Sequence, residues 1–187
     1  KEGNGQYYDR VIGTFTYQNS KESRNDRDFN ATDFFETDES VDAISVGLDF
    51  VKKLETKRNK IFYGLEYIHN KVHSDGQVTN ITTGDIANTA SRYPDGSTWQ
   101  SLAAYASAQI ELSDNTHLQT GLRYNHILLA ADFSDNNEFF AFPFQNADLS
   151  TGNLTGSFGV THEVSKKVSV KANVGTAFRA PNIDDVG

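Results

Sequence analysis

Apolar and polar residues alternate along seven stretches of the chain, and this period of two predicts seven β-strands. The stretches cover residues 7–18, 41–54, 60–73, 101–112, 117–125, 154–163 and 168–179. Successive residues of a strand point to opposite faces, so each predicted strand has one apolar row and one row of small, polar or charged residues. Most of these runs exceed the roughly 5–6 residues usual for soluble strands, and they reach the roughly 9–11 residues that a tilted membrane-spanning strand needs.

The predicted connections alternate between long and short along the chain. Long polar connections are expected at residues 19–40, 74–96 and 131–152, and tight turns at 55–59, 113–115 and 165–167. Outer-membrane barrels place tight turns on the periplasmic side and long loops on the outside. The pattern therefore predicts an all-β fold, an antiparallel up-and-down transmembrane β-barrel segment. Because bacterial single-chain barrels have even strand numbers, we expect seven to eight strands of a larger barrel.

Composition narrows the classes of partner and compartment. The 187 residues carry a net charge of −8, which argues against a nucleic-acid partner. No apolar run is long enough for a membrane-spanning helix, and the first residues carry no signal segment, so we expect an internal or mature part of a longer polypeptide. Aromatic residues make up 12% of the chain, enough for interfacial girdles, and Tyr17, Tyr67, Tyr93 and Trp99 are expected at the outer one.

Charged residues on the polar rows are the first candidates for a site. The alternation places Asp49, Glu66, Arg123 and Lys171 on rows that would face the lumen of a barrel. Such charges can hold a polar plug or line a passage, and a solvated barrel interior is the alternative interpretation. In a soluble sandwich the same alternation would put the apolar rows in a core instead.

Histidines and acidic stretches supply weaker candidates. His69 and His73 are four residues apart, hence on one face of a strand, and with Asp75 they are candidates for a ligand or metal contact. Their spacing fits no zinc signature, so no metal site is predicted. The acidic stretch 26–39 and the pair Asp184–Asp185 lack the spacing of an EF-hand and are interpreted as exposed acidic loops. No catalytic constellation is visible, so neither an enzyme nor a cofactor is predicted.

The C-terminal sequence Gly-Thr-Ala-Phe-Arg-Ala-Pro-Asn at 175–182 resembles the barrel motif of TonB-dependent outer-membrane receptors, notably their haem branch. The resemblance implies that Phe178, Arg179, Ala180 and Pro181 close a strand near the extracellular side. Segments 93–97 and 121–124 look similar to the same family. In addition, Arg179 is expected to pair with loop carbonyls or a neighbouring carboxylate, and a contact with the plug or the ligand is the alternative.

The resemblance also implies a function. Receptors of this family capture a scarce, large nutrient (an iron complex such as haem or a siderophore, or cobalamin) at the bacterial outer membrane and import it with TonB-coupled energy. The expected partners are membrane lipid, the TonB system and a small-molecule nutrient. Residues 1–187 would be a partial barrel domain, with the plug and remaining strands elsewhere in the polypeptide. A smaller outer-membrane channel or adhesin and a soluble β-sheet binding module are the alternatives.

Overall fold

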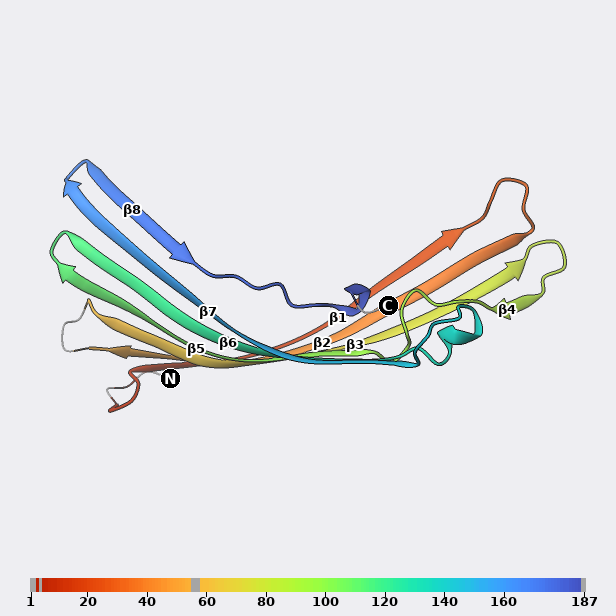
Figure 1. The fold of residues 1–187 in the computed structure, drawn as a ribbon, viewed down its shortest axis with the longest axis horizontal. Coiled ribbons are helices and arrows are strands. Elements are labelled where there is room, and N and C mark those ends of the chain that lie inside the picture. Colours follow the sequence, from red (N-terminus) through yellow and green to blue (C-terminus); the bar gives the residue numbers. More distant parts are fainter. Residues whose placement is uncertain (1–2, 4, 55–57, 186–187) are drawn as a thin grey trace.

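One curved antiparallel sheet makes up the computed structural model, which describes residues 3, 5–54 and 58–185 (Figure 1). The first of the predicted tight turns, 55–59, lies partly outside the described residues. The elements are β1 (Arg10–Asp26), β2 (Asp33–Lys53), β3 (Lys60–Asn80), β4 (Ile86–Asn88), β5 (Thr98–Ser113), β6 (Thr116–Asp132), η1 (Asn136–Glu138), β7 (Asn146–Ser165), β8 (Val168–Gly175) and η2 (Ile183–Asp185).

The strands follow one another across the sheet in the order β1-β2-β3-β5-β6-β7-β8, and the short β4 pairs with the end of β3. Every pairing is antiparallel, which confirms the predicted up-and-down order. The paired residues Lys53 and Lys60, where β2 ends and β3 begins, lie at one end of the sheet together with connections 114–115 and 166–167, whereas 27–32, 81–97 and 133–145 lie at the other (Figure 1). The predicted sorting of connections between the two ends is therefore confirmed.

At the end of the sheet with the longer connections, three of the predicted boundaries are wrong. The expected loop 19–40 is mostly strand, since β1 and β2 pair from Arg10↔Val51 to Asp26↔Phe35 and leave only 27–32 as a turn. Likewise β3 runs on to Asn80, and β7 begins at Asn146. Most residues of these extensions are polar, and the few apolar ones, such as the adjacent Phe34 and Phe35, form no long alternating run, while pairing alone satisfies the backbone N–H and C=O groups.

The two faces of the sheet differ as the alternation predicts. The apolar face, defined by residues such as Val46, Leu65, Leu122 and Leu154, leaves these side chains 41–62% exposed. On this face Phe50 and Tyr63 stack near the short-turn end, with ring centroids 5.0 Å apart. A broad apolar surface without any covering layer is expected where lipid, and not water, is the solvent.

The opposite, polar face carries Asp49, Glu66 and Arg123 and is partly covered near the end with the longer connections. After β8 the segment 176–185 crosses this face (Figure 1), and the indole Nε1 of Trp99 donates to the carbonyl of Pro181 at 3.0 Å. Ile183 packs against a buried cluster of Leu129, Ala131 and Phe133.

The expected outer girdle is therefore only half correct. Tyr17 and Tyr67 lie on the apolar face, 59% and 38% exposed, next to the partner residues Ile44 and Val46. Trp99 instead lies on the polar face beneath segment 176–185, and Tyr93 lies in the connection before β5. Trp99 belongs to the polar row because β5 already includes it, at an even spacing from Ser101 and Tyr105.

Candidate functional site

A line of paired residues crosses the middle of the polar face from β2 to β7. Asp49 pairs with Gly64, Gly64 with Tyr105, Tyr105 with Arg123 and Arg123 with Thr155. Paired residues in neighbouring strands put their side chains on the same face, so these groups form one row. Gly64 leaves space in that row, and the ring of Tyr105 extends across it to donate a hydrogen bond from its hydroxyl to Asp49.

Arg123 is the centre of a second set of contacts on the same face. Its Nη2 donates to Oε1 of Glu66 at 2.5 Å, and its Nε donates to Oδ1 of Asn125 at 2.6 Å. The amide of Asn125 donates in turn to Oγ of Ser101 at 3.1 Å. Charge-assisted hydrogen bonds of this kind hold side chains in fixed positions. The structure thus brings together Asp49, Glu66 and Arg123, three of the four residues singled out on the polar rows.

Lys171 and the C-terminal motif lie apart from this set. Lys171 is opposite Thr161 in the exposed strand β8, towards the short-turn end. The strand predicted for 168–179 is too long, because β8 ends at Gly175 and residues 178–181 lie outside the sheet. Arg179 donates from Nη2 to both carboxylate oxygens of Asp185, at 2.6 and 2.9 Å. A carboxylate thus pairs with Arg179, one of the structural roles expected from the sequence.

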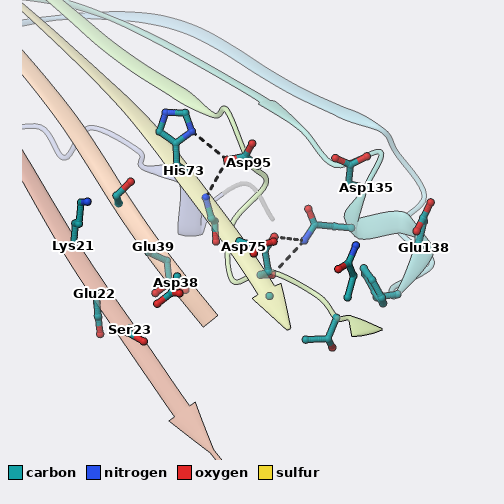
Figure 2. Close-up of a pocket in the computed structure, with 18 residues that line it drawn as sticks. Lys21, Glu22, Ser23, Asp38, Glu39, His73, Asp75, Asp95, Asp135 and Glu138 are labelled. Atoms are coloured by element: carbon teal, nitrogen blue, oxygen red, sulfur yellow. Dashed lines mark hydrogen bonds and ion pairs between the residues drawn. The ribbon is translucent and has the colours of Figure 1, made fainter. Parts of the chain in front are cut away.

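A cleft of about 1010 Å³ opens at the end of the sheet with the longer connections (Figure 2). Strands β1, β2 and β3 contribute one side, and the connections around β4 and η1 contribute the other. Its charged lining consists of seven acidic residues and a single lysine: Glu22, Asp38, Glu39, Asp75, Asp95, Asp135, Glu138 and Lys21. The cleft is therefore strongly negative.

Close backbone contacts fix the wall of this cleft. Oδ1 of Asp95 accepts a hydrogen bond from the backbone N–H of Ser74 at 3.0 Å and lies 3.4 Å from Nδ1 of His73. A Cβ at Gly76 would lie 2.6 Å from the carbonyl oxygen of Ala90, so only glycine permits this approach of segment 89–95. These contacts order the wall without any ligand.

The structure separates the predicted group of His69, His73 and Asp75. His73 and Asp75 both line the cleft, where His73 faces Asp95 (Figure 2). His69 lies further along β3, opposite Ile44 and Gln100, and is outside the lining. Within residues 3, 5–54 and 58–185, no group of three or more histidine, cysteine, aspartate or glutamate side chains is arranged to hold a metal ion.

Two glutamates face each other in the cleft, and only one of them is neutralised. Glu22 and Glu39 are directly opposite in β1 and β2. Arg24 donates to Glu22 at 2.7 Å and Arg92 lies 3.9 Å from it, and the Arg24 hydrogen bond lowers the pKa of Glu22. Glu39 is 7% exposed, and neither of its carboxylate oxygens has a hydrogen-bond partner. The acidic stretch 26–39, expected to be an exposed loop, thus contains a buried carboxylate.

Sequence reasoning missed Glu39 because its burial depends on segments far away in the chain. The available signal is its pairing with Glu22, since like charges opposite each other in a sheet are unfavourable. That pairing is visible only once the strand register is known.

None of the helices in the described part of the chain is both long and apolar enough to traverse a bilayer.

Comparisons with known proteins agree with the fold. The copper transporter OprC superimposes with a TM-score of 0.81 at 13% identity, covering 97% of this chain and 28% of OprC. The unliganded ferric citrate transporter FecA gives a TM-score of 0.65 at 13% identity, covering 93% of this chain and 26% of FecA. The chain thus spans about a quarter of the length of these two structures, and no curated protein matches it.

A family match adds an assignment to this likeness of fold. Residues 2–187 match the family described as TonB dependent receptor-like, beta-barrel. The match covers all ten secondary-structure elements, including the C-terminal segment with Phe178 and Arg179. The match confirms the predicted resemblance, and this family consists of transport receptors and not of enzymes. The chain therefore belongs to the TonB-dependent receptor β-barrel family.

Proposed function

We propose that the protein containing this chain is a bacterial outer-membrane receptor that captures a scarce nutrient and imports it with TonB-coupled energy. The observation that carries the proposal is the family match over residues 2–187. The exposed apolar face and the sorting of connections between the two ends support it, because a membrane barrel needs both. Membrane lipid would cover the apolar face, and the longer connections would lie outside the cell.

Residues 1–187 would then be part of a larger barrel. The chain covers only 28% of OprC and 26% of FecA, which supports a partial barrel domain with further strands and a plug elsewhere in the polypeptide. Barrels of about 22 strands contain such a plug. OprC and FecA are named as transporters of copper and ferric citrate. These names support a metal-containing cargo. We propose an iron complex, such as haem or a ferric siderophore, or cobalamin.

The polar face would line the lumen in this arrangement. Asp49, Glu66 and Arg123 would present fixed polar groups to the plug, and Lys171 would add a positive charge near the periplasmic end. The hydrogen bonds of Arg123 to Glu66 and Asn125 support this role, because they satisfy these groups within the wall itself. Residues 178–181 would hold segment 176–185 across the lumen near its extracellular side.

Expression of the full-length gene tests the proposal. The expected result is a protein in the outer-membrane fraction that migrates faster on gels before heating than after it. Iron-limited cells should take up a radiolabelled ferric complex only when both the receptor and TonB are present. Uptake without TonB would favour a smaller channel or adhesin, and recovery in solution without detergent would favour a soluble binding module. Either result would contradict the proposal.

A further inference from the structure

The carboxylate of Glu39 is buried at the cleft without a hydrogen-bond partner. Its side chain lines the cleft (Figure 2) next to its register partners Glu22 of β1 and Ser74 of β3, and neither of its oxygens has a hydrogen-bond donor. Arg24 is near enough to Glu39 to attract it electrostatically but donates its hydrogen bond to Glu22. Burying an unpaired carboxylate costs free energy, and a positively charged donor removes that cost.

The surroundings of Glu39 reinforce this requirement for a cation. Six further acidic residues and one lysine line the same cleft, so its lining is negative and attracts a positive group, although Arg24 and Arg92 compensate the charge of Glu22. The volume of about 1010 Å³ is at the upper end of the range of small-molecule sites, roughly 300–1,000 Å³. The wall is held by its own contacts, through Asp95 and Gly76, so the space exists before any ligand arrives.

We infer that this cleft binds the cationic group of an organic ligand, with Glu39 as its principal partner. The described acidic and histidine side chains are not arranged to hold a metal ion directly. The Glu39 carboxylate, whose two buried oxygens accept no hydrogen bond, matches the two parallel N–H donors of a guanidinium, which is the group that fits best. The inference rests on the proposed function, which places the opening of the cleft on the extracellular side, from which the ligand would enter. It predicts that the receptor prefers positively charged cargo to anionic metal chelates.

A pair of matched probes tests the inference on the full-length receptor in detergent micelles. N-acetyl-L-argininamide carries a guanidinium, and N-acetyl-L-citrullinamide carries a neutral urea group of nearly the same shape. Calorimetric titration at about 20 mM salt keeps electrostatic screening weak. The arginine probe should bind at least about tenfold more tightly than the citrulline probe, which corresponds to about 1.4 kcal/mol.

Substitutions at Glu39 give two readouts of opposite direction. Glu39→Gln should weaken the arginine probe at least about tenfold. The same change should maintain or raise the thermal stability of the unliganded receptor, because it removes a buried charge without a partner. Glu39→Asp keeps the charge and should retain part of the affinity. The matched control is Asp114→Asn, an exposed acidic residue in the turn at the opposite end, which should change neither quantity.

Each of the following results would overturn the inference. Equal binding of the two probes, or equal binding by Glu39→Gln, would remove the role of charge at this residue. Loss of thermal stability in Glu39→Gln would show that a cation from elsewhere in the polypeptide already pairs with it. Binding of Ca²⁺, and not of the arginine probe, would make the cleft a metal site. Titration in micelles requires no energised membrane, so TonB-dependent uptake without probe binding contradicts this inference and leaves the proposed function intact.

Discussion

Gly64 is the position at which one added methyl group should disturb the polar face most. It lies in β3 between its partners Asp49 and Tyr105, and the Tyr105 ring crosses it to reach Asp49. A Cβ built at Gly64 would lie 2.5 Å from the carbonyl oxygen of Leu48 and 2.7 Å from Cε1 of Tyr105. The first of these is a backbone atom within the sheet and cannot move independently of its strand. Gly64→Ala therefore displaces either the tyrosine or the backbone.

Two costs and one gain determine the size of the effect. Overpacking a well-filled site costs about 1–3 kcal/mol. Displacing the Tyr105 hydroxyl from the Asp49 carboxylate costs about 1.5–3 kcal/mol more, the usual value for a hydrogen bond to a charged group. Replacing glycine by alanine returns about 0.4–1 kcal/mol, because the unfolded chain has fewer conformations to lose. Together these values predict that Gly64→Ala lowers the free energy of unfolding by about 1.5–5.5 kcal/mol.

The urea midpoint of the full-length receptor in detergent micelles measures this change. Gly47→Ala is the matched control, since a Cβ at Gly47 meets only Cβ of Thr14, at an ordinary 3.9 Å. Gly47→Ala should leave the midpoint unchanged or raise it slightly. In a Tyr105→Ala background Gly64→Ala should cost less, because the ring is gone. Equal midpoints for Gly64→Ala and Gly47→Ala would refute the reasoning.

Three further predictions concern the two faces, the C-terminal segment and the short-turn end. Val46→Lys on the apolar face should destabilise the membrane-inserted barrel by about 2–4 kcal/mol, and Ser45→Lys on the polar face by much less, as measured by unfolding from lipid vesicles. Trp99→Phe removes the donor to the Pro181 carbonyl, so limited proteolysis should cut segment 176–185 faster, while an unchanged rate would contradict that anchor. A backbone N–H at the end of β2 donates to Asp9 and lowers its pKa below 3.8, so this contact stabilises the fold above about pH 4 and is lost in stronger acid. Asp9→Asn should remove that part of the acid sensitivity of the melting temperature.

The membership of the polar row could be predicted because strand periodicity is local. Asp49, Glu66 and Arg123 each occupy alternate positions in a regular run, and the tight turns allow little freedom of register. Their grouping in one region of the polar face follows from these two facts. The particular partners do not: Arg123 donates to Glu66 two strands away, and this contact requires the register of β3, β5 and β6 together.

The strand ends were poorly predicted because polar strands leave no alternating pattern. Residues 19–26 and 33–40 look like loop in the sequence, yet they pair residue by residue, from Asn19↔Asp42 to Asp26↔Phe35. In the proposed membrane barrel these hairpins would extend beyond the bilayer and meet water on both faces, so neither row would need a regular series of apolar side chains. The three-residue strand β4 is equally invisible, since three exposed residues are too few to show a period.

The sequence by itself determined the antiparallel order, the two-faced strands, the sorting of the connections and the family, because alternation, turn chemistry and a short motif are local properties. Only the tertiary structure decided which polar groups have partners. Glu39 and Glu22 lie in equally acidic sequence, but arginines neutralise one while the other is buried and unpaired. The path of residues 176–185 across the polar face was likewise decided only by the tertiary structure. Burial and pairing depend on segments that are distant in the chain, and no local pattern encodes them.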